Sequence, residues 1–185
     1  RLSYTLLIVS AIVLAISSAL YNEEIMTLLY RSNTHLSSQI FGILMIGFTG
    51  IATTYIFGSL LTANGSMKQL NIMAFCGMTL NVLLNLILIP RHGAVGSAFA
   101  SVSTQVLTGA AQLVLGLIIF GLKPGLKPVF QMLLFTVLVG VLGFLSTLLE
   151  DWVTGYLGMI LASVAVAFLL KLVNLKDLTR IIFYK

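Results

Sequence analysis

The feature that most constrains this chain is a series of six apolar runs from which charged side chains are nearly absent. The runs cover residues 3–20, 37–63, 70–89, 94–121, 129–149 and 153–172, and each reaches the roughly 20 residues that a helix needs to cross a bilayer. The whole chain is 59% hydrophobic and only 8% charged, whereas a soluble domain is about 25% charged. We therefore predict an all-α, polytopic transmembrane helical bundle of about six spans, without a soluble catalytic domain.

Polar and turn residues between the runs divide the chain further. The break at residues 123–128 contains two lysines and two prolines, so we expect four transmembrane helices in residues 1–122 and two more in 123–173. Residues 174–185 carry apolar side chains at helical spacing beside basic ones, which is typical of a cytoplasmic interfacial tail or of a solvated one. The segment 21–36, with Glu23 and Glu24, predicts a short interfacial helix on the outer side.

Basic residues predict the orientation, because loops on the cytoplasmic side are enriched in Lys and Arg. With Arg1 inside, all ten Lys and Arg except Arg31 and Arg91 fall on the cytoplasmic side. Both ends of this segment should then be cytoplasmic. The chain opens at Arg1 without an initiator Met, a basic signal region or a cleavage site, and we interpret it as a piece of a longer protein.

Two groups of small residues predict close contacts between helices. Pro90 should end the third span at Ile89, and Gly93 should permit a tight reversal before a stretch rich in small residues that includes Gly93, Gly96 and Ser97. Gly50, Thr54, Gly58 and Thr62 recur every four residues and so share one helix face. Such stripes let two helix backbones approach each other in a membrane. Arg91 and His92 beside the turn are either solvated loop residues or groups that grip a phosphate.

Polar residues inside the runs are the candidates for a functional site. Asn81 and Asn85 are four residues apart, and a second stripe on the fourth run consists of Ser97, Ser101, Gln105, Thr108 and Gln112. Such residues form interhelical hydrogen bonds or line a cavity. We select Asn81, Asn85, Gln105 and Gln112 as substrate-cavity candidates, and Gly50, Thr54, Gly58, Gly93, Gly96 and Ser97 as helix-packing positions.

No Asp, Glu, Lys, Arg or His lies deep within any predicted span, so any anion-binding or proton-coupling group of the full protein should lie outside this piece. We predict no catalytic residue, no metal site and no cofactor. The lone Cys76 should be a small buried side chain.

The stretch FGSLLTANGSMKQLNIMAFCGMTLNVLLNLILIPRHGAVGSAFASVSTQ carries a resemblance to a known family. Its pattern resembles the C-terminal part of bacterial polysaccharide flippases, the O-antigen and capsule repeat-unit translocases of the multidrug/oligosaccharidyl-lipid/polysaccharide exporter superfamily. The matched positions are Asn81, Asn85, Leu88, Ile89, Pro90, Gly93, Gly96, Ser97 and Ala98. Upstream, EEIMTLLYRS is similar to a family turn in which Arg31 stands where Gly is common. The resemblance covers residues 10–120, and the last two runs fit only by hydropathy.

The resemblance implies a partial C-terminal lobe of a two-lobe transporter in the inner (plasma) membrane, working by alternating access and not an enzyme. It implies as partners a lipid-linked oligosaccharide on undecaprenyl pyrophosphate, membrane lipids and the remaining N-terminal helices of the same protein, and no nucleic acid. One alternative is a cation-coupled multidrug exporter of the same superfamily, with carboxylates in the missing half. A second is a membrane-bound glycan-assembly enzyme, although His35, His92 and the Glu150-Asp151 pair form no cluster by sequence.

Overall fold

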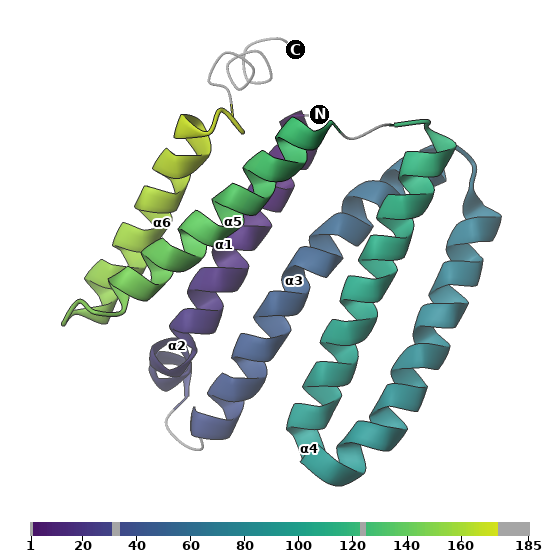
Figure 1. Cartoon of the computed structure of the whole chain (residues 1–185). Helices are drawn as coiled ribbons and strands as arrows, with labels where there is room; N and C mark the ends of the chain where they lie inside the picture. Colours follow the sequence, from purple (N-terminus) through teal and green to yellow (C-terminus); the bar gives the residue numbers. More distant parts are fainter. Residues whose placement is uncertain (1, 31–33, 123–124, 174–185) are drawn as a thin grey trace. The chain divides into compact units, whose positions relative to one another are not determined.

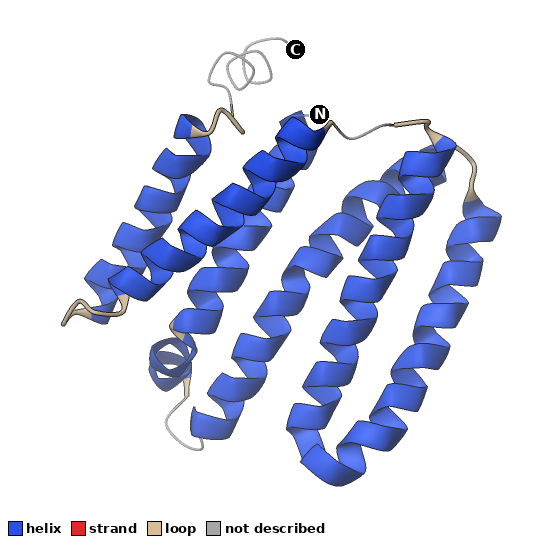
Figure 2. Ribbon diagram, in the orientation of Figure 1, coloured by secondary structure: helices blue, strands red, loops and turns tan. Residues whose placement is uncertain are grey.

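The structure, a computed structural model, describes residues 2–30, 34–122 and 125–173, which form helices joined by short turns (Figures 1 and 2). The helices are α1 (Leu2–Leu20), α2 (Asn22–Leu29), α3 (Thr34–Ala63), α4 (Met67–Ile119), α5 (Leu126–Ser146) and α6 (Trp152–Leu169). No strand occurs in these ranges, so the all-α prediction is confirmed. The predicted tail, residues 174–185, and the Arg31 turn lie outside the described residues.

Four of these helices, α3 to α6, are long and apolar enough to cross a membrane. The pair of α1 and α2, which breaks at Tyr21, would add a fifth crossing if it acts as one span. Two of the six predicted spans lie within the single helix α4, which has 53 residues. The helices are compatible with a multi-pass membrane protein.

Helix α4 is a hairpin rather than a straight rod (Figure 1). Its first arm, residues 67–92, reverses at Gly93, which has φ 56° and ψ −134°, and its second arm, residues 94–119, runs back beside the first. Only glycine adopts such a conformation readily. The prediction that Pro90 ends the third span is wrong, since the helix continues through it. Pro90 removes one backbone hydrogen bond close to the helix end and its ring is exposed, so the last turn persists.

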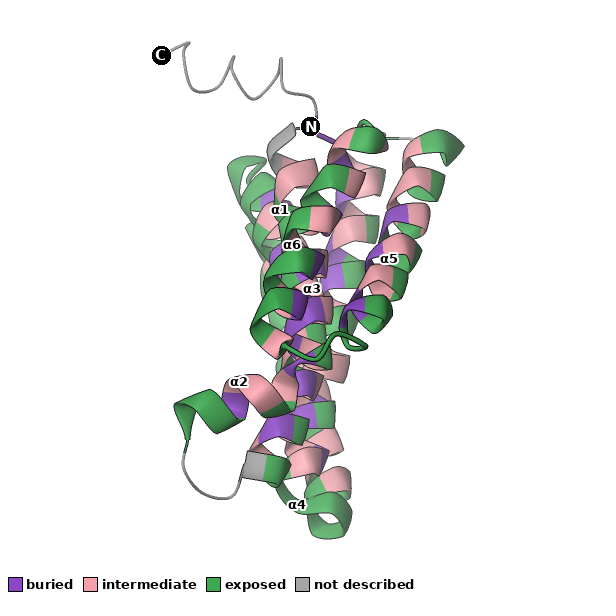
Figure 3. Ribbon diagram, turned by 90° about the vertical axis from the view of Figure 1, so that its left-hand side faces the viewer, coloured by how far each residue is buried: buried purple, intermediate pink, exposed green. Residues whose placement is uncertain are grey.

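The predicted short helix after α1 is present, with Glu23 and Glu24 in the first turn of α2. Cys76 was expected to be buried and is exposed. It lies on the outer face of the first arm, which carries several exposed large apolar side chains, including Ile72, Phe75 and Val82. Figure 3 shows that most residues of each helix are exposed or half-buried.

The chain forms two compact units. Of the described residues, unit 1 contains 2–21 and 125–173, and unit 2 contains 22–30 and 34–122. The division after residue 123 lies next to the predicted boundary, but α1 belongs with α5 and α6 instead of with α3 and α4. The reason is that α1 contacts both α5 and α6, whereas its sequence neighbour α2 packs on α3.

Unit 1 is held at one end by the Tyr21 hydroxyl. The hydroxyl donates to Ser146 Oγ at 2.8 Å, and Ser146 Oγ donates in turn to the carbonyl of Gly143 at 2.7 Å. Tyr21 is 2% exposed, and its ring meets Tyr156 edge to face with 5.6 Å between ring centres. Gly155 leaves the space for the hydroxyl, because a Cβ there would lie 2.5 Å from Tyr21 Oη. One phenol therefore links the end of α1 to α5 and α6.

Unit 2 is built on contact between glycines of α3 and of the second arm of α4. A Cβ on Gly50 would lie 2.8 Å from the backbone oxygen of Gln105, and a Cβ on Gly109 would lie 2.8 Å from the backbone oxygen of Gly50. Gly116 similarly faces the ring of Phe57. The second arm thus packs against α3 on one side and against the first arm on the other, and lies between them (Figure 1).

Candidate functional site

The four cavity candidates separate into two pairs at different helix contacts. Asn81 and Asn85 lie on the first arm of α4, where Asn81 faces the second arm. Gln105 and Gln112 lie on the second arm and face α3. All four belong to unit 2, yet the structure does not bring them together around one space. Their role as cavity residues stays a prediction.

A short hydrogen-bonded series connects the two arms at the asparagine pair. Asn85 Nδ2 donates to the backbone oxygen of Asn81 at 2.9 Å and to Asn81 Oδ1 at 3.0 Å. Asn81 Nδ2 donates across the hairpin to Thr104 Oγ1 at 3.3 Å. The Thr104 hydroxyl donates to the carbonyl of Ala100 at 2.8 Å. Thr104 was not predicted, although it stands close to the register position opposite Asn81 in a hairpin that turns at Gly93.

A hollow of about 310 Å³ lies beside this pair. It is lined by residues of the first arm: Asn81, Val82, Asn85, Leu86, Ile89 and Pro90. At 1.5 Å per residue, Asn81 lies roughly 20 Å along the arm from Met67, which places it near the middle of the first arm. The hollow can accommodate an apolar or mixed ligand surface beside two amide groups.

Both glutamines of the second arm carry a buried side-chain oxygen with no hydrogen-bond partner among the described residues. Gln112 is 7% exposed, and its Oε1 lies 3.2 Å from the place where a Cβ on Gly58 would stand. Gln105 Oε1 approaches Gly47 more closely still. The glycines of α3 therefore accommodate these amides, and the hollow beside Asn81 is not lined by either glutamine.

The predicted packing positions take different roles. Gly50 and Gly58 face the second arm, and Gly96 lies directly against the backbone carbonyl of Leu88 in the first arm. Thr54 and Ser97 are half-buried. Gly93 was predicted as a helix-packing position, but no atom of another residue lies within 4 Å of where its Cβ would stand. Gly93 therefore forms the turn through its backbone conformation.

At the contact between α3 and the second arm, sequence reasoning missed Gly47, Gly109 and Gly116 as packing glycines. A signal for the last two exists, because Gln105, Gly109, Gln112 and Gly116 recur every three to four residues on one face of the second arm. On that face each glutamine is followed by a glycine, and this alternation of amide and small residues is typical of a helix contact.

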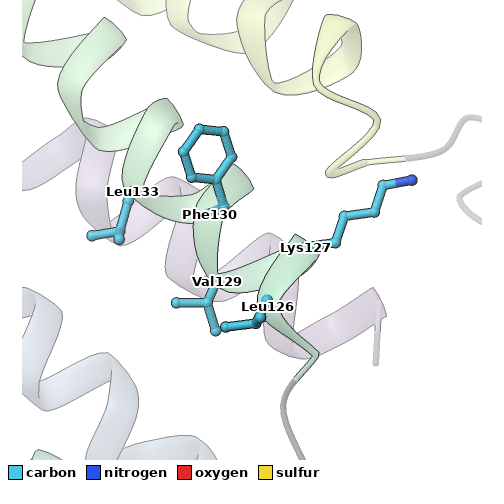
Figure 4. Close-up of a pocket in the computed structure, with 5 residues that line it drawn as sticks. All are labelled: Leu126, Lys127, Val129, Phe130 and Leu133. Atoms are coloured by element: carbon cyan, nitrogen blue, oxygen red, sulfur yellow. The ribbon is translucent and has the colours of Figure 1, made fainter.

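A second hollow, about 460 Å³, lies on the first turns of α5 (Figure 4). Its lining comes from this one helix: Leu126, Lys127, Val129, Phe130 and Leu133. The Lys127 side chain points away from Leu133 in Figure 4. The surface is apolar with one ammonium group at its edge, which suits contact with hydrocarbon chains.

The Lys, Arg and His side chains in the described parts of α3 to α6 lie near helix ends or at the hairpin turn: His35, Lys68, Arg91, His92 and Lys127. Asp151 caps α6 by accepting from the backbone N–H groups of Val153 and Thr154. Hydrogen bonds from the Thr154 hydroxyl and backbone lower the pKa of Asp151 below its usual value. Within the described ranges, no three His, Cys, Asp or Glu side chains gather where they would hold a metal ion.

Comparison of the chain with protein-family models, with curated proteins and with solved structures gives no match. The resemblance to polysaccharide flippases therefore rests on the sequence pattern alone. In the structure, three residues of that pattern, Leu88, Gly93 and Gly96, form the turn of the α4 hairpin.

Proposed function

We propose that this chain is part of an inner-membrane transporter that translocates a lipid-linked oligosaccharide by alternating access. The observation that carries the proposal is the Asn81 and Asn85 pair beside a hollow that is otherwise lined by apolar side chains of the first arm of α4. Polar side chains are costly at that depth in hydrocarbon and usually face a polar ligand, a cavity or another helix. The resemblance of the surrounding residues to polysaccharide flippases supports the same assignment.

Uncharged amides suit the proposed cargo physically. A glycan headgroup must cross about 30 Å of hydrocarbon, and it exposes hydroxyl groups that need hydrogen-bond partners throughout the passage. Asparagine supplies a donor and an acceptor without the cost of burying a charge. The carrier's hydrocarbon tail needs only apolar surface, such as the α5 face around Phe130 and Leu133.

The glycine contacts of unit 2 support a protein whose helices rearrange during transport. Alternating access requires two arrangements that differ by a few kcal/mol and a ligand that favours one of them. At Gly50 and Gly109 the two helices meet backbone to backbone, without a side chain between them. We propose that the remaining N-terminal helices of the longer protein complete the cavity, and that both ends of this segment face the cytoplasm.

A cellular test separates transport from other roles. In the organism that carries the gene, the gene is deleted and the lipid-linked oligosaccharide pool and the surface polysaccharide are both quantified. Loss of surface polysaccharide together with accumulation of the lipid-linked precursor supports translocation. Unchanged surface polysaccharide without accumulation would overturn the proposal, and loss of the precursor itself would indicate an assembly enzyme.

The same assay tests the residues when the deleted gene is replaced by variants. Asn81→Leu and Asn85→Leu should reduce export at unchanged protein level, because the cavity loses its amides. Thr136→Val on α5 is a matched control, since its hydroxyl is exposed and donates only to the backbone carbonyl of Met132. Equal export by all three variants would remove the asparagine pair from the transport site.

A further inference from the structure

The hydrogen bonds around Asn85 have a fixed direction. Asn85 places one side-chain atom 2.9 Å from the backbone oxygen of Asn81. A carbonyl oxygen only accepts, so this atom must be the Nδ2 donor. The other amide atom of Asn85, Oδ1, therefore points elsewhere.

The orientation of Asn81 follows from that of Asn85. Asn85 Nδ2 also lies 3.0 Å from the Asn81 side chain, which must therefore present its oxygen there and its Nδ2 to Thr104. Thr104 has to accept, and it does so because its own proton is donated to the carbonyl of Ala100. Backbone carbonyls thus fix the polarity of the series at both ends.

The open end of the series is an acceptor. Asn85 Oδ1 is buried and has no donor among the described residues, although Asn85 lines the hollow on the first arm. Leaving such an acceptor unpaired costs free energy that a donor would recover.

We propose that this hollow binds a hydroxyl group, which donates to Asn85 Oδ1, and that Thr104 is the positioning residue that keeps the acceptor facing the ligand. The inference rests on the proposed function and deepens it: this part of the cavity contacts sugar hydroxyls of the cargo and not its pyrophosphate. A phosphate oxygen has no proton to donate at neutral pH and would meet an acceptor. Leu86 and Ile89, which wall the hollow, are 68% and 46% exposed, so they change rotamer without repacking a core as the ligand enters.

The test compares two probes with equal tails on the full chain in phosphatidylcholine nanodiscs. One is decyl glucoside, which carries hydroxyl donors, and the other is decyl phosphocholine, which carries none; both bear a diazirine in the tail. Cross-linking to the peptide of the first arm, followed by mass spectrometry, gives a half-saturation concentration for each probe. We expect the glucoside to bind about tenfold more tightly, the value of one good hydrogen bond.

Four variants assign the preference to the series. Asn85→Leu and Thr104→Val should bring the ratio of the two half-saturation concentrations to about one, whereas Thr104→Ser keeps the hydroxyl and should retain the preference. Asn85→Gln keeps the amide but displaces its oxygen, and should give an intermediate ratio. The ratio, rather than total binding, is the readout that a merely structural role of Thr104 would leave unchanged, and helical circular dichroism verifies folding.

Equal half-saturation of the two probes on the wild-type chain would overturn the acceptor site, and so would a preference that survives in Asn85→Leu. If Thr104→Val fails to fold, the two variants Asn85→Leu and Asn85→Gln decide the outcome. Failure of the proposed function is seen separately, because probe binding does not require transport. A retained glucoside preference in a protein whose deletion leaves export unchanged would refute the flippase and keep the hydroxyl site.

Discussion

The contact between Gly50 and Gly109 provides a quantitative test of the fold of unit 2. In Gly50→Ala the new Cβ would lie 2.8 Å from the backbone carbonyl atoms of Gln105, whereas ordinary contact begins at 3.4 Å. Backbone atoms cannot rotate away, so α3 and the second arm must separate by about 0.6 Å. Overpacking of this kind costs about 1–3 kcal/mol, and the better helix propensity of alanine returns up to about 1 kcal/mol. We expect a net loss of about 1–2 kcal/mol.

The assay is reversible unfolding in mixed dodecylmaltoside and dodecylsulfate micelles, followed by circular dichroism. Gly140→Ala on α5 is the matched control, because nothing lies within 4 Å of its Cβ position and the variant should be as stable as wild type or more so. Gly109→Ala should cost about as much as Gly50→Ala, and the double variant less than the sum, since one separation relieves both clashes. Wild-type stability of Gly50→Ala would refute the close contact.

Three further predictions concern the packed hydroxyl, the hairpin turn and a helix cap. Ser146→Ala leaves the buried Tyr21 hydroxyl without its acceptor and should lower the free energy of unfolding by about 1–3 kcal/mol. Tyr21→Phe removes the donor and should lower it by about 0.5–1.5 kcal/mol. Equal losses in the same micelle titration would contradict the direction of this hydrogen bond. Gly93→Ala should cost about 1–3 kcal/mol because of its φ of 56°, and an unchanged unfolding midpoint would rule out this turn. The lowered pKa of Asp151 means that its cap on α6 is complete above the usual Asp pKa and is lost as pH falls through the lowered folded value. Helicity followed by circular dichroism should decrease there in wild type and not in Asp151→Asn, and identical pH profiles would exclude the cap.

The helix boundaries were largely predictable because their causes are local. Span length follows from the apolar runs, and turns follow from groups such as Asn64-Gly65-Ser66, where Gly65 has φ 77° and Ser66 precedes α4. Pro90 was misread for a reason that is also physical. Pro90 removes one hydrogen bond and its ring crowds the preceding turn, but it does not reverse the chain. The reversal occurs at Gly93, where the backbone leaves the helical conformation.

The polar face of the second arm was less predictable, because its meaning depends on two neighbours at once. Thr108 faces Gly77 of the first arm, whereas Gln105 and Gln112 face Gly47 and Gly58 of α3. Spacing alone places these residues on one broad side of a helix. The sequence does not indicate that a different helix lies on each half of that side, so this polar face is divided between two helix contacts.

The contact between the two arms, by contrast, could be derived once the turn is placed at Gly93. Residues that pair across the hairpin lie at nearly equal distances along the chain from that glycine, as in Gly77 with Thr108, Asn81 with Thr104 and Leu88 with Gly96. Thr104 is therefore the residue expected opposite Asn81, and a threonine in a helix commonly donates its proton to the preceding turn. Those two facts give the direction of the Asn81 hydrogen bond, and with it an acceptor at Asn85. The packing of Gln105 on α3 follows from no such rule, since the two helices are joined only through the first arm.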